Sequence, residues 1–383
     1  MHLLGRLHAL AAAEYWFAPS SQASFAWGGA VSLGLPYFLR DQRPGGFLGR
    51  LVPGRYPELG LPARVVDWND HHYLQYLTRR GADTVGDLIL GDESFNEHVE
   101  LLKRRAAIAV DERATAFPRL ARQVMAGSLP GFSAHGEHPK FAALLRQGEV
   151  YQHLLVKFSP PVDTAVGQRW SDLLVAEHLA HDVLRGAAIE ATRSRIFQFD
   201  RVTFLELERF DRRSLHGRVG VTSMSAIDAR LYGKLDNWMA SAARLYRDHR
   251  IDAQTVELVK LISTFGALIA NTDRHFGNLA MFDRYDGRFR LAPVYDMLPM
   301  LFAPQHDEIV ARVFEPSDPT AETLTVYPRA RALAERYWRR LAEDARVSDD
   351  FRKIAAGCAQ ALEALPKVGA YAYAEDPAAG RGL

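Results

Sequence analysis

The chain has 383 residues, of which 48% are hydrophobic and 24% charged, and its formal net charge is +1. This composition is typical of a globular protein with a sizeable core, and the length indicates two or three subdomains. The near-zero charge argues against a surface that coats nucleic acid. The single cysteine, Cys358, excludes an intrachain disulfide, and no apolar run reaches the ~20 residues of a membrane span. We therefore expect a soluble, cytoplasmic protein with Cys358 buried and no membrane contact.

The composition of the chain changes near residue 125. Residues 1–125 are rich in aromatic residues, Gly and Pro, and we expect them to form an N-terminal subdomain. The pattern there predicts helices over 84–90 and 97–107. Further on, apolar runs flanking a polar turn predict a β-hairpin, followed by a helix and two more strands. The predicted elements are strands 141–145 and 150–158, helix 171–185, and strands 196–199 and 203–210.

The second half of the chain is mainly helical in its periodicity. Residues 231–246 read as one amphipathic helix, and residues 256–270 are apolar on nearly every face, which predicts a buried central helix. A hairpin at 279–282 and 289–294 and two helices at 327–341 and 349–365 follow. Residues 374–383 have little to bury, so we expect a flexible tail.

The segment from Asn271 to Asp296 carries the most specific motif. It reads N-T-D-R-H-F-G-N, and after a short hairpin it ends in Y-D. Phosphoryl transfer requires an Asp that accepts the proton of the attacking hydroxyl, and then an Asn and a second Asp that hold Mg²⁺. Asp273, Asn278 and Asp296 have this order and spacing, and we expect His275 to orient the loop. The alternative is a solvated helix cap, which does not explain the later Tyr-Asp pair.

A lysine on the second hairpin strand predicts a phosphate contact. Lys157 is the one basic residue in Leu154 to Phe158, where a kinase lysine neutralises the nucleotide phosphates and pairs with a glutamate on a helix. Glu177 on the following helix is the natural partner, although Asp172 and Glu190 compete with it. Alternatively, Lys157 is an exposed residue at a strand end.

Two further segments predict nucleotide contacts. Ahead of the hairpin, Gly136 lets the backbone approach phosphate oxygens and Lys140 adds positive charge, although many such loops are merely turns. The strand that ends at Glu208, Arg209 and Phe210 would form a hinge, with its backbone on the adenine edge and Phe210 on the ring. An ordinary solvated strand end is the alternative.

Together these segments predict an α+β, two-lobed, protein-kinase-like fold. A mixed-sheet N-lobe would contain the subdomain 1–125 and a nucleotide-binding core at 126–212 with the glycine loop and the hinge. A mainly helical C-lobe would span 213–373 and carry the catalytic loop, followed by the tail 374–383.

The same residues resemble the HipA family of bacterial serine/threonine kinases over roughly residues 30–365. The similar segments are S-x-x-G-x-x-P-K at 133–140, E-R-F-D-R at 208–212, and N-T-D-x-H-x-x-N through Y-D at 271–296. The run L-P-Y-F-L-R-D-x-R-P-x-G-F-L-G-R at 35–50 is similar to the family's N-terminal subdomain, most of all in the YjjJ branch. Three residues depart from the usual glycine loop, which is bulkier here: His135, Glu137 and His138.

The resemblance implies an ATP- and Mg²⁺-dependent kinase, often the toxin of a toxin–antitoxin pair with a DNA-binding antitoxin as partner. It implies a protein substrate among translation components such as aminoacyl-tRNA synthetases. It also implies autophosphorylation at Ser133, whose added charge of about −1.5 to −2 would repel the nucleotide phosphates. Members of the YjjJ branch carry a DNA-binding segment before the shared region. The sequence shows none, so we expect no direct nucleic-acid binding.

Two other functions are compatible with the same motifs. A sugar or antibiotic kinase shares the two-lobed layout and the Asp/Asn/Asp set. A non-catalytic regulatory protein could retain a vestigial site, but the intact triad argues against this reading.

Overall fold

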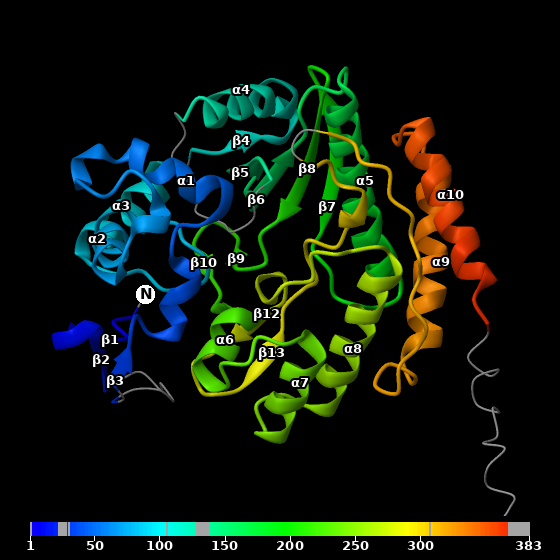
Figure 1. Cartoon of the computed structure of the whole chain (residues 1–383). Helices are drawn as coiled ribbons and strands as arrows, with labels where there is room; N and C mark the ends of the chain where they lie inside the picture. The colour runs from blue at the N-terminus through cyan, green and yellow to red at the C-terminus, as the bar shows by residue number, and fades with distance from the viewer. Residues whose placement is uncertain are drawn as a thin grey trace, which may run out of the picture.

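The computed structural model describes residues 2–21, 29, 31–104, 106–127, 138–305 and 308–366. Two lobes lie side by side, with an N-terminal group of short elements against one edge (Figure 1). Among the described residues, no helix combines the length and hydropathy that a membrane span requires. Ser133, Gly136, His135, Glu137 and the predicted tail 374–383 lie outside the described residues.

The N-lobe is built on a five-stranded sheet with helices on both faces (Figure 1). The strands β5, β6, β8 and β7 are antiparallel neighbours in that order, and β4 pairs in parallel with β5 at the edge. Helix α4 covers one face around Phe117, and α5 covers the other around Leu174. The bounds are β4 Ile108–Ala109, β5 Lys140–Gln147, β6 Val150–Phe158, β7 Ser194–Phe199, β8 Val202–Glu208, α4 Arg113–Met125 and α5 Ala165–Gly186.

The C-lobe encloses the largest apolar core. Helix α8 is buried along most of its length, as its apolar sequence predicts, and Trp338 of α9 donates from Nε1 to the carbonyl of Leu268 over 3.0 Å. Cys358 on α10 is buried, which confirms that prediction. The elements are α6 Met224–Leu231, α7 Trp238–Arg247, α8 Ala253–Leu268, α9 Tyr327–Glu343, α10 Asp349–Ala364, β11 Val221–Ser223, β12 Ala280–Asp283 and β13 Phe289–Leu291.

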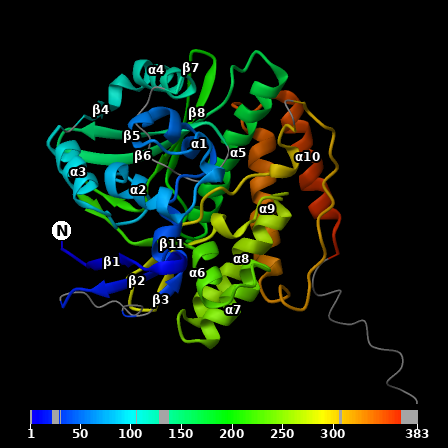
Figure 2. The same cartoon turned by 60° about the vertical axis from the view of Figure 1, so that its left-hand side comes forward.

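The N-terminal subdomain consists of a β-meander and a group of helices. The meander lies near α6 in both views (Figures 1 and 2). Phe38, which follows the meander, packs between Phe17 and Tyr285 of the β12–β13 turn at ring-centroid distances of 5.4 and 6.3 Å. The elements are β1 Gly5–Ala9, β2 Glu14–Pro19, β3 Val31–Leu33, the 3-10 helix η2 Tyr37–Gln42, α1 Gly46–Arg55, α2 Asp70–Arg80 and α3 Asp92–Arg104.

Three sequence predictions need correction. Residues 84–90 are irregular rather than helical, because Gly86 has φ +81° and Arg212 and Arg218 donate to its carbonyl and to that of Thr84. The helix predicted at 97–107 runs instead from Asp92 to Arg104. The helix predicted at 231–246 begins only at Trp238, as α7, and a separate helix, α6, ends at Leu231. Asp228 captures the amides of Lys234 and Leu235 and ends α6.

A network of buried charges joins the N-terminal subdomain to the segment after β8. Arg209 and Arg212 bind Asp83 and Asp211 with N–O distances between 2.7 and 3.1 Å. Arg218, on the short strand β10 (Gly217–Arg218), donates to three backbone carbonyls of residues 82–86. The network therefore fixes the position of the irregular segment at residues 82–86.

Candidate active site

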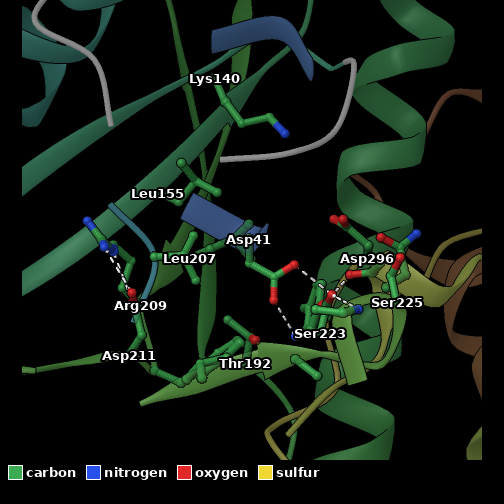
Figure 3. Close-up of a pocket in the computed structure, with 18 of the residues that line it drawn as sticks. Asp41, Lys140, Leu155, Thr192, Leu207, Arg209, Asp211, Ser223, Ser225 and Asp296 are labelled. Atoms are coloured by element: carbon green, nitrogen blue, oxygen red, sulfur yellow. Dashed lines mark hydrogen bonds and ion pairs between the residues drawn. The ribbon is translucent and has the colours of Figure 1, made fainter. Parts of the chain in front are cut away.

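A cavity of about 520 Å³ lies where the two lobes and the N-terminal subdomain meet. Leu155 and Leu207, from the α5-covered sheet, form one wall, and Asp296 and Ser225 lie on the opposite wall, with Lys140 above them (Figure 3). One side of the cavity is therefore apolar and the other carries charge, as is typical of sites that bind small molecules of mixed character. Other lining residues are Arg40, Asp41, Lys157, Thr192, Glu208, Phe210, His275, Gly277, Asn278 and Tyr295.

Lys157 forms the electrostatic centre of the cavity wall. Its Nζ lies 2.8 Å from both carboxylate oxygens of Glu177 and also contacts Asp296. Of the three candidate partners, the structure thus pairs Glu177 with Lys157; Asp172 instead accepts from Ser348. Burial lowers the pKa of Lys157, but the two carboxylates outweigh it and raise the pKa above its ordinary value. Lys157 is therefore a permanently charged, buried cation, and not an exposed strand-end residue.

Asp296 is held as a carboxylate at a strained backbone position. Its φ is +50°, a left-handed conformation that costs a non-glycine residue energy. Burial alone would raise the pKa of Asp296, but Lys157 and Lys140 outweigh it and lower the pKa to about 2. Asn271, which is buried at the end of the central helix, donates from its amide to the Asp296 carbonyl over 3.3 Å. Asp296 is thus ionised at neutral pH and fixed in direction.

The predicted catalytic loop follows α8 and is folded back on itself by side-chain amides. Asn271 Oδ1 accepts from the Asp273 amide over 3.0 Å, and Asn278 Nδ2 donates to the Asp273 carbonyl over 2.9 Å. Tyr295 donates its hydroxyl to the carbonyl of Gly277, which links the loop to the residue before Asp296. The loop and the Asp296 segment therefore form one hydrogen-bonded unit.

Asp273 lies at the edge of the site and does not line the cavity itself. Its carboxylate is half exposed, and its Oδ1 lies 3.9 Å from Nε2 of His275, which does line the cavity. Burial raises the pKa of Asp273 above its ordinary value. The His275 backbone is fixed by Trp238, whose Nε1 donates to its carbonyl over 3.0 Å. Asp273 is thus placed where a hydroxyl group entering from solvent could reach it.

The oxygen atoms of Asn278 and Asp296 are suited to a magnesium ion. Asn278 commits its Nδ2 to Asp273, which leaves the amide oxygen available, and both residues line the same cavity. Mg²⁺ is usually held by one or two protein oxygens together with phosphates and water. The donor set therefore fits magnesium bound with a nucleotide and would be too small to hold the ion alone.

Of the residues predicted to form a hinge, some make hydrogen bonds within the protein and others face the cavity. The amide of Glu208 donates to Arg193 and that of Arg209 to His153, both over 2.9 Å. The Arg209 side chain turns into the charge network with Asp211 (Figure 3). Within the described residues the Phe210 amide has no partner, so this amide, and not the whole hinge, is open to a ligand edge.

At the end of the predicted glycine loop, Lys140 is buried and faces Lys157 across the β5–β6 pair. His138 packs on Trp170 of α5, with ring centroids 4.8 Å apart. Burial, reinforced by the two lysines, lowers the pKa of His138 to about 3. This bulky loop residue is therefore neutral and adds no charge beside the lysines.

Sequence reasoning missed the contribution of the N-terminal subdomain to the cavity. Asp41 at the end of η2 accepts from the Ser223 amide and hydroxyl, each over 2.6 Å (Figure 3). Arg40 beside it also lines the cavity, as does Thr192 on the opposite side. The run Leu35 to Asp41 carried a family resemblance, which was the available signal, but nothing in it indicated a role.

Comparison with known proteins agrees with this architecture. Residues 132–365 match the HipA-like C-terminal domain family, and residues 1–99 match the middle domain of YjjJ-like toxins. The chain is 35% identical to toxin YjjJ of Escherichia coli (strain K12) over 329 residues, which cover 84% of this chain and 73% of that protein. The chain therefore belongs to the HipA-like toxin family, and its N-terminal residues match the YjjJ-like members.

The solved structure of a HipA protein confirms the predicted fold class. HipA of Shewanella oneidensis MR-1, in a complex with HipB and its operator DNA, superimposes with a TM-score of 0.58 at 15% identity. The superposition covers 94% of this chain and 93% of that HipA. The proinflammatory kinase CtkA of Helicobacter pylori aligns over 61% of this chain and 90% of its own, with a TM-score of 0.42 and 13% identity. The two-lobed, kinase-like α+β fold is thus shared with HipA.

Proposed function

We propose that this protein is an ATP- and Mg²⁺-dependent serine/threonine protein kinase that acts as a toxin. One observation carries the proposal: Lys157, paired with Glu177 and in contact with Asp296, lies on the wall of a cavity that Asn278 also lines. A buried cation and two metal-suited oxygens on one cavity wall match the needs of a nucleotide triphosphate. The cavity volume of about 520 Å³ lies within the ordinary range for small-molecule sites.

Each residue has a defined role in this proposal. Lys157 and Lys140 neutralise the phosphates, and the free Phe210 amide binds the adenine edge while its ring contacts the base. Asn278 and Asp296 would hold Mg²⁺, which offsets charge on the transferring phosphoryl group. Asp273 accepts the proton of the attacking hydroxyl, and rigid positioning by the loop contributes more to the rate than its pKa does.

The partners we propose follow from the family. The HipA neighbour is described with HipB and operator DNA, which supports a DNA-binding antitoxin as a partner for this chain. A translation component such as an aminoacyl-tRNA synthetase is the proposed substrate. Ser133 is the proposed autophosphorylation site, where the added negative charge would oppose nucleotide binding beside Lys140.

Substitution of the proposed base tests the activity. In Asp273→Asn, Mg·ATP binding measured by calorimetry should remain within about threefold of wild type, while turnover should fall by roughly 10³-fold or more. Asp350→Asn, on the exposed face of α10, is the matched control and should behave as wild type. Phosphorylation by Asp273→Asn at the wild-type rate would show that Asp273 is not the base.

The nature of the substrate and the Ser133 proposal need two further experiments. Wild-type protein is incubated with Mg·ATP and analysed by intact mass and phosphosite mapping, in parallel with Ser133→Ala. A gain of one phosphate at Ser133 in the wild type alone would support autophosphorylation. The substrate class is tested separately, by incubation with labelled ATP, cell lysate and metabolites. Label on metabolites and on no protein would indicate a small-molecule kinase.

A further inference from the structure

A second cavity, of about 530 Å³, lies behind the predicted hinge. Its walls come from the end of α5, the segment 188–193, the hinge residues and the turn around β13. Thr192, Glu208, Arg209 and Phe210 line both this cavity and the active-site cavity, so the two share one wall. None of the predicted catalytic residues Asp273, His275, Asn278 and Asp296 lines it. We call it the hinge-back cavity.

Positive charge dominates the lining of the hinge-back cavity. Six arginines line it, against two glutamates: Arg185, Arg193, Arg209, Arg212, Arg213 and Arg290 against Glu190 and Glu208. Four of the arginines are already committed to ion pairs with carboxylates. Arg193 and Arg213 are exposed, and neither has a side-chain hydrogen bond or ion pair within the described parts of the chain. Two guanidinium groups are therefore available to a ligand.

The network behind the cavity wall adds to this positive charge. Within the described ranges, two carboxylates, Asp83 and Asp211, pair with three arginines there, Arg209, Arg212 and Arg218. Uncompensated charge close to a concave surface attracts anions more strongly than the same charge on a convex, solvated surface.

A buried hydroxyl group gives a second and independent indication of a ligand. Thr192 is only 5% exposed, and within the described residues its Oγ1 has no hydrogen-bond partner. Buried hydroxyls are normally satisfied by protein or by a bound molecule. Thr192 lines both the hinge-back cavity and the active-site cavity, so a ligand oxygen in either could accept from its hydroxyl.

We propose that the hinge-back cavity binds a small, phosphate-bearing molecule of about nucleotide size, at a site distinct from the active-site cavity. The planar guanidinium fork matches phosphate oxygens in a bidentate manner, and the cavity volume suits a small ligand. The acidic residues Glu190 and Glu208 interrupt the basic surface, which disfavours the extended backbone of a nucleic acid. The proposal does not depend on the kinase activity.

A ligand in this cavity would contact a segment that connects the hinge to the segment before Asp296. The carbonyl of Arg193 accepts from Glu208, and the amide of Thr192 donates to Val294, each over 2.9 Å. Val294 lies two residues before Asp296. Backbone hydrogen bonds therefore connect the lining of the hinge-back cavity to two parts of the active-site wall.

Calorimetric titration with inorganic pyrophosphate tests the proposal at fixed salt. The double variant Arg193→Ala/Arg213→Ala should bind at least roughly tenfold more weakly than wild type, the loss expected when charged hydrogen bonds are removed. The matched control Arg247→Ala/Arg288→Ala removes the same charge at exposed positions outside the cavity and should bind as wild type. Thermal melting checks that all variants fold.

Three results would overturn the proposal. Wild-type protein that does not bind pyrophosphate would refute it directly. Equal affinity in wild type and Arg193→Ala/Arg213→Ala would place the anion elsewhere, for example beside Lys157. Tighter binding of a single-stranded oligonucleotide than of pyrophosphate, dependent on the same two arginines, would identify a nucleic-acid surface. No assay here uses ATP turnover, so failure of this proposal is distinguishable from failure of the proposed kinase activity.

Discussion

Replacement of Arg209 by alanine should destabilise the protein strongly, although Arg209 lies in the segment first read as a ligand-binding hinge. Its guanidinium is 4% exposed and donates to Asp83 and Asp211 at 3.0 to 3.1 Å. Removing one partner of a buried ion pair typically costs ~3–5 kcal/mol, because a carboxylate remains buried without compensation. Asp83 retains 36% exposure and both carboxylates keep Arg212, so we expect about 3 kcal/mol, the lower end of that range.

Urea unfolding followed by tryptophan fluorescence measures this effect. Arg213→Ala is the matched control, since this neighbouring arginine is exposed, and its unfolding free energy should stay within ~0.5 kcal/mol of wild type. In a double-mutant cycle, Asp211→Asn should cost much less in the Arg209→Ala background than in wild type. If Arg209→Ala lost less than ~1 kcal/mol, the network would not hold the subdomain in place and the reasoning would be refuted.

Two further outcomes follow from the charged groups. Lys157→Met should cost ~3 kcal/mol or more of stability, because it leaves the buried Glu177 carboxylate beside the partly exposed Asp296 without a cation, and it should abolish Mg·ATP binding by calorimetry. Lys157→Arg should recover part of the stability, and a fully stable Lys157→Met would contradict the ion-pair argument. For Asp211, burial raises the pKa but Arg209 and its neighbour outweigh it and lower the pKa to about 2. The ionised Asp211 carboxylate stabilises the folded protein above the unfolded-state pKa of ~4, and this contribution is lost as pH falls toward 2. The free energy of unfolding should therefore fall less steeply with acid in Asp211→Asn over that range.

The sequence predicted best the elements whose periodicity and packing agree. The β5–β6 hairpin and helices α5, α8, α9 and α10 appear where alternation or helical spacing placed them, with ends shifted by a few residues. Their apolar faces are buried, so local pattern and tertiary environment favour the same conformation. The Lys157–Glu177 pair was predictable for the same reason, because the lysine lies on a strand and the glutamate on the helix that follows it.

The errors arise where distant residues decide local structure. Residues 84–90 have helical composition, but arginines more than 120 positions later bind their carbonyls and hold them in an irregular path. Asp228 interrupts an otherwise regular amphipathic pattern by accepting two amides beyond its helix. Asp41 and Thr192 reach the active-site cavity only because separate subdomains dock there. Such contributions depend on tertiary geometry that no local pattern contains.

The hydrogen bond between Asp41 and Ser223 bears on which parts of the chain build the cavity. These residues are 182 positions apart, yet both line the active-site cavity. The C-terminal region that matches the wider HipA family therefore does not enclose its own cleft: an auxiliary segment completes it. Diversification of that segment would alter which molecules enter the cleft while leaving the proposed phosphoryl-transfer residues unchanged, so selectivity and the proposed chemistry could change separately in this architecture.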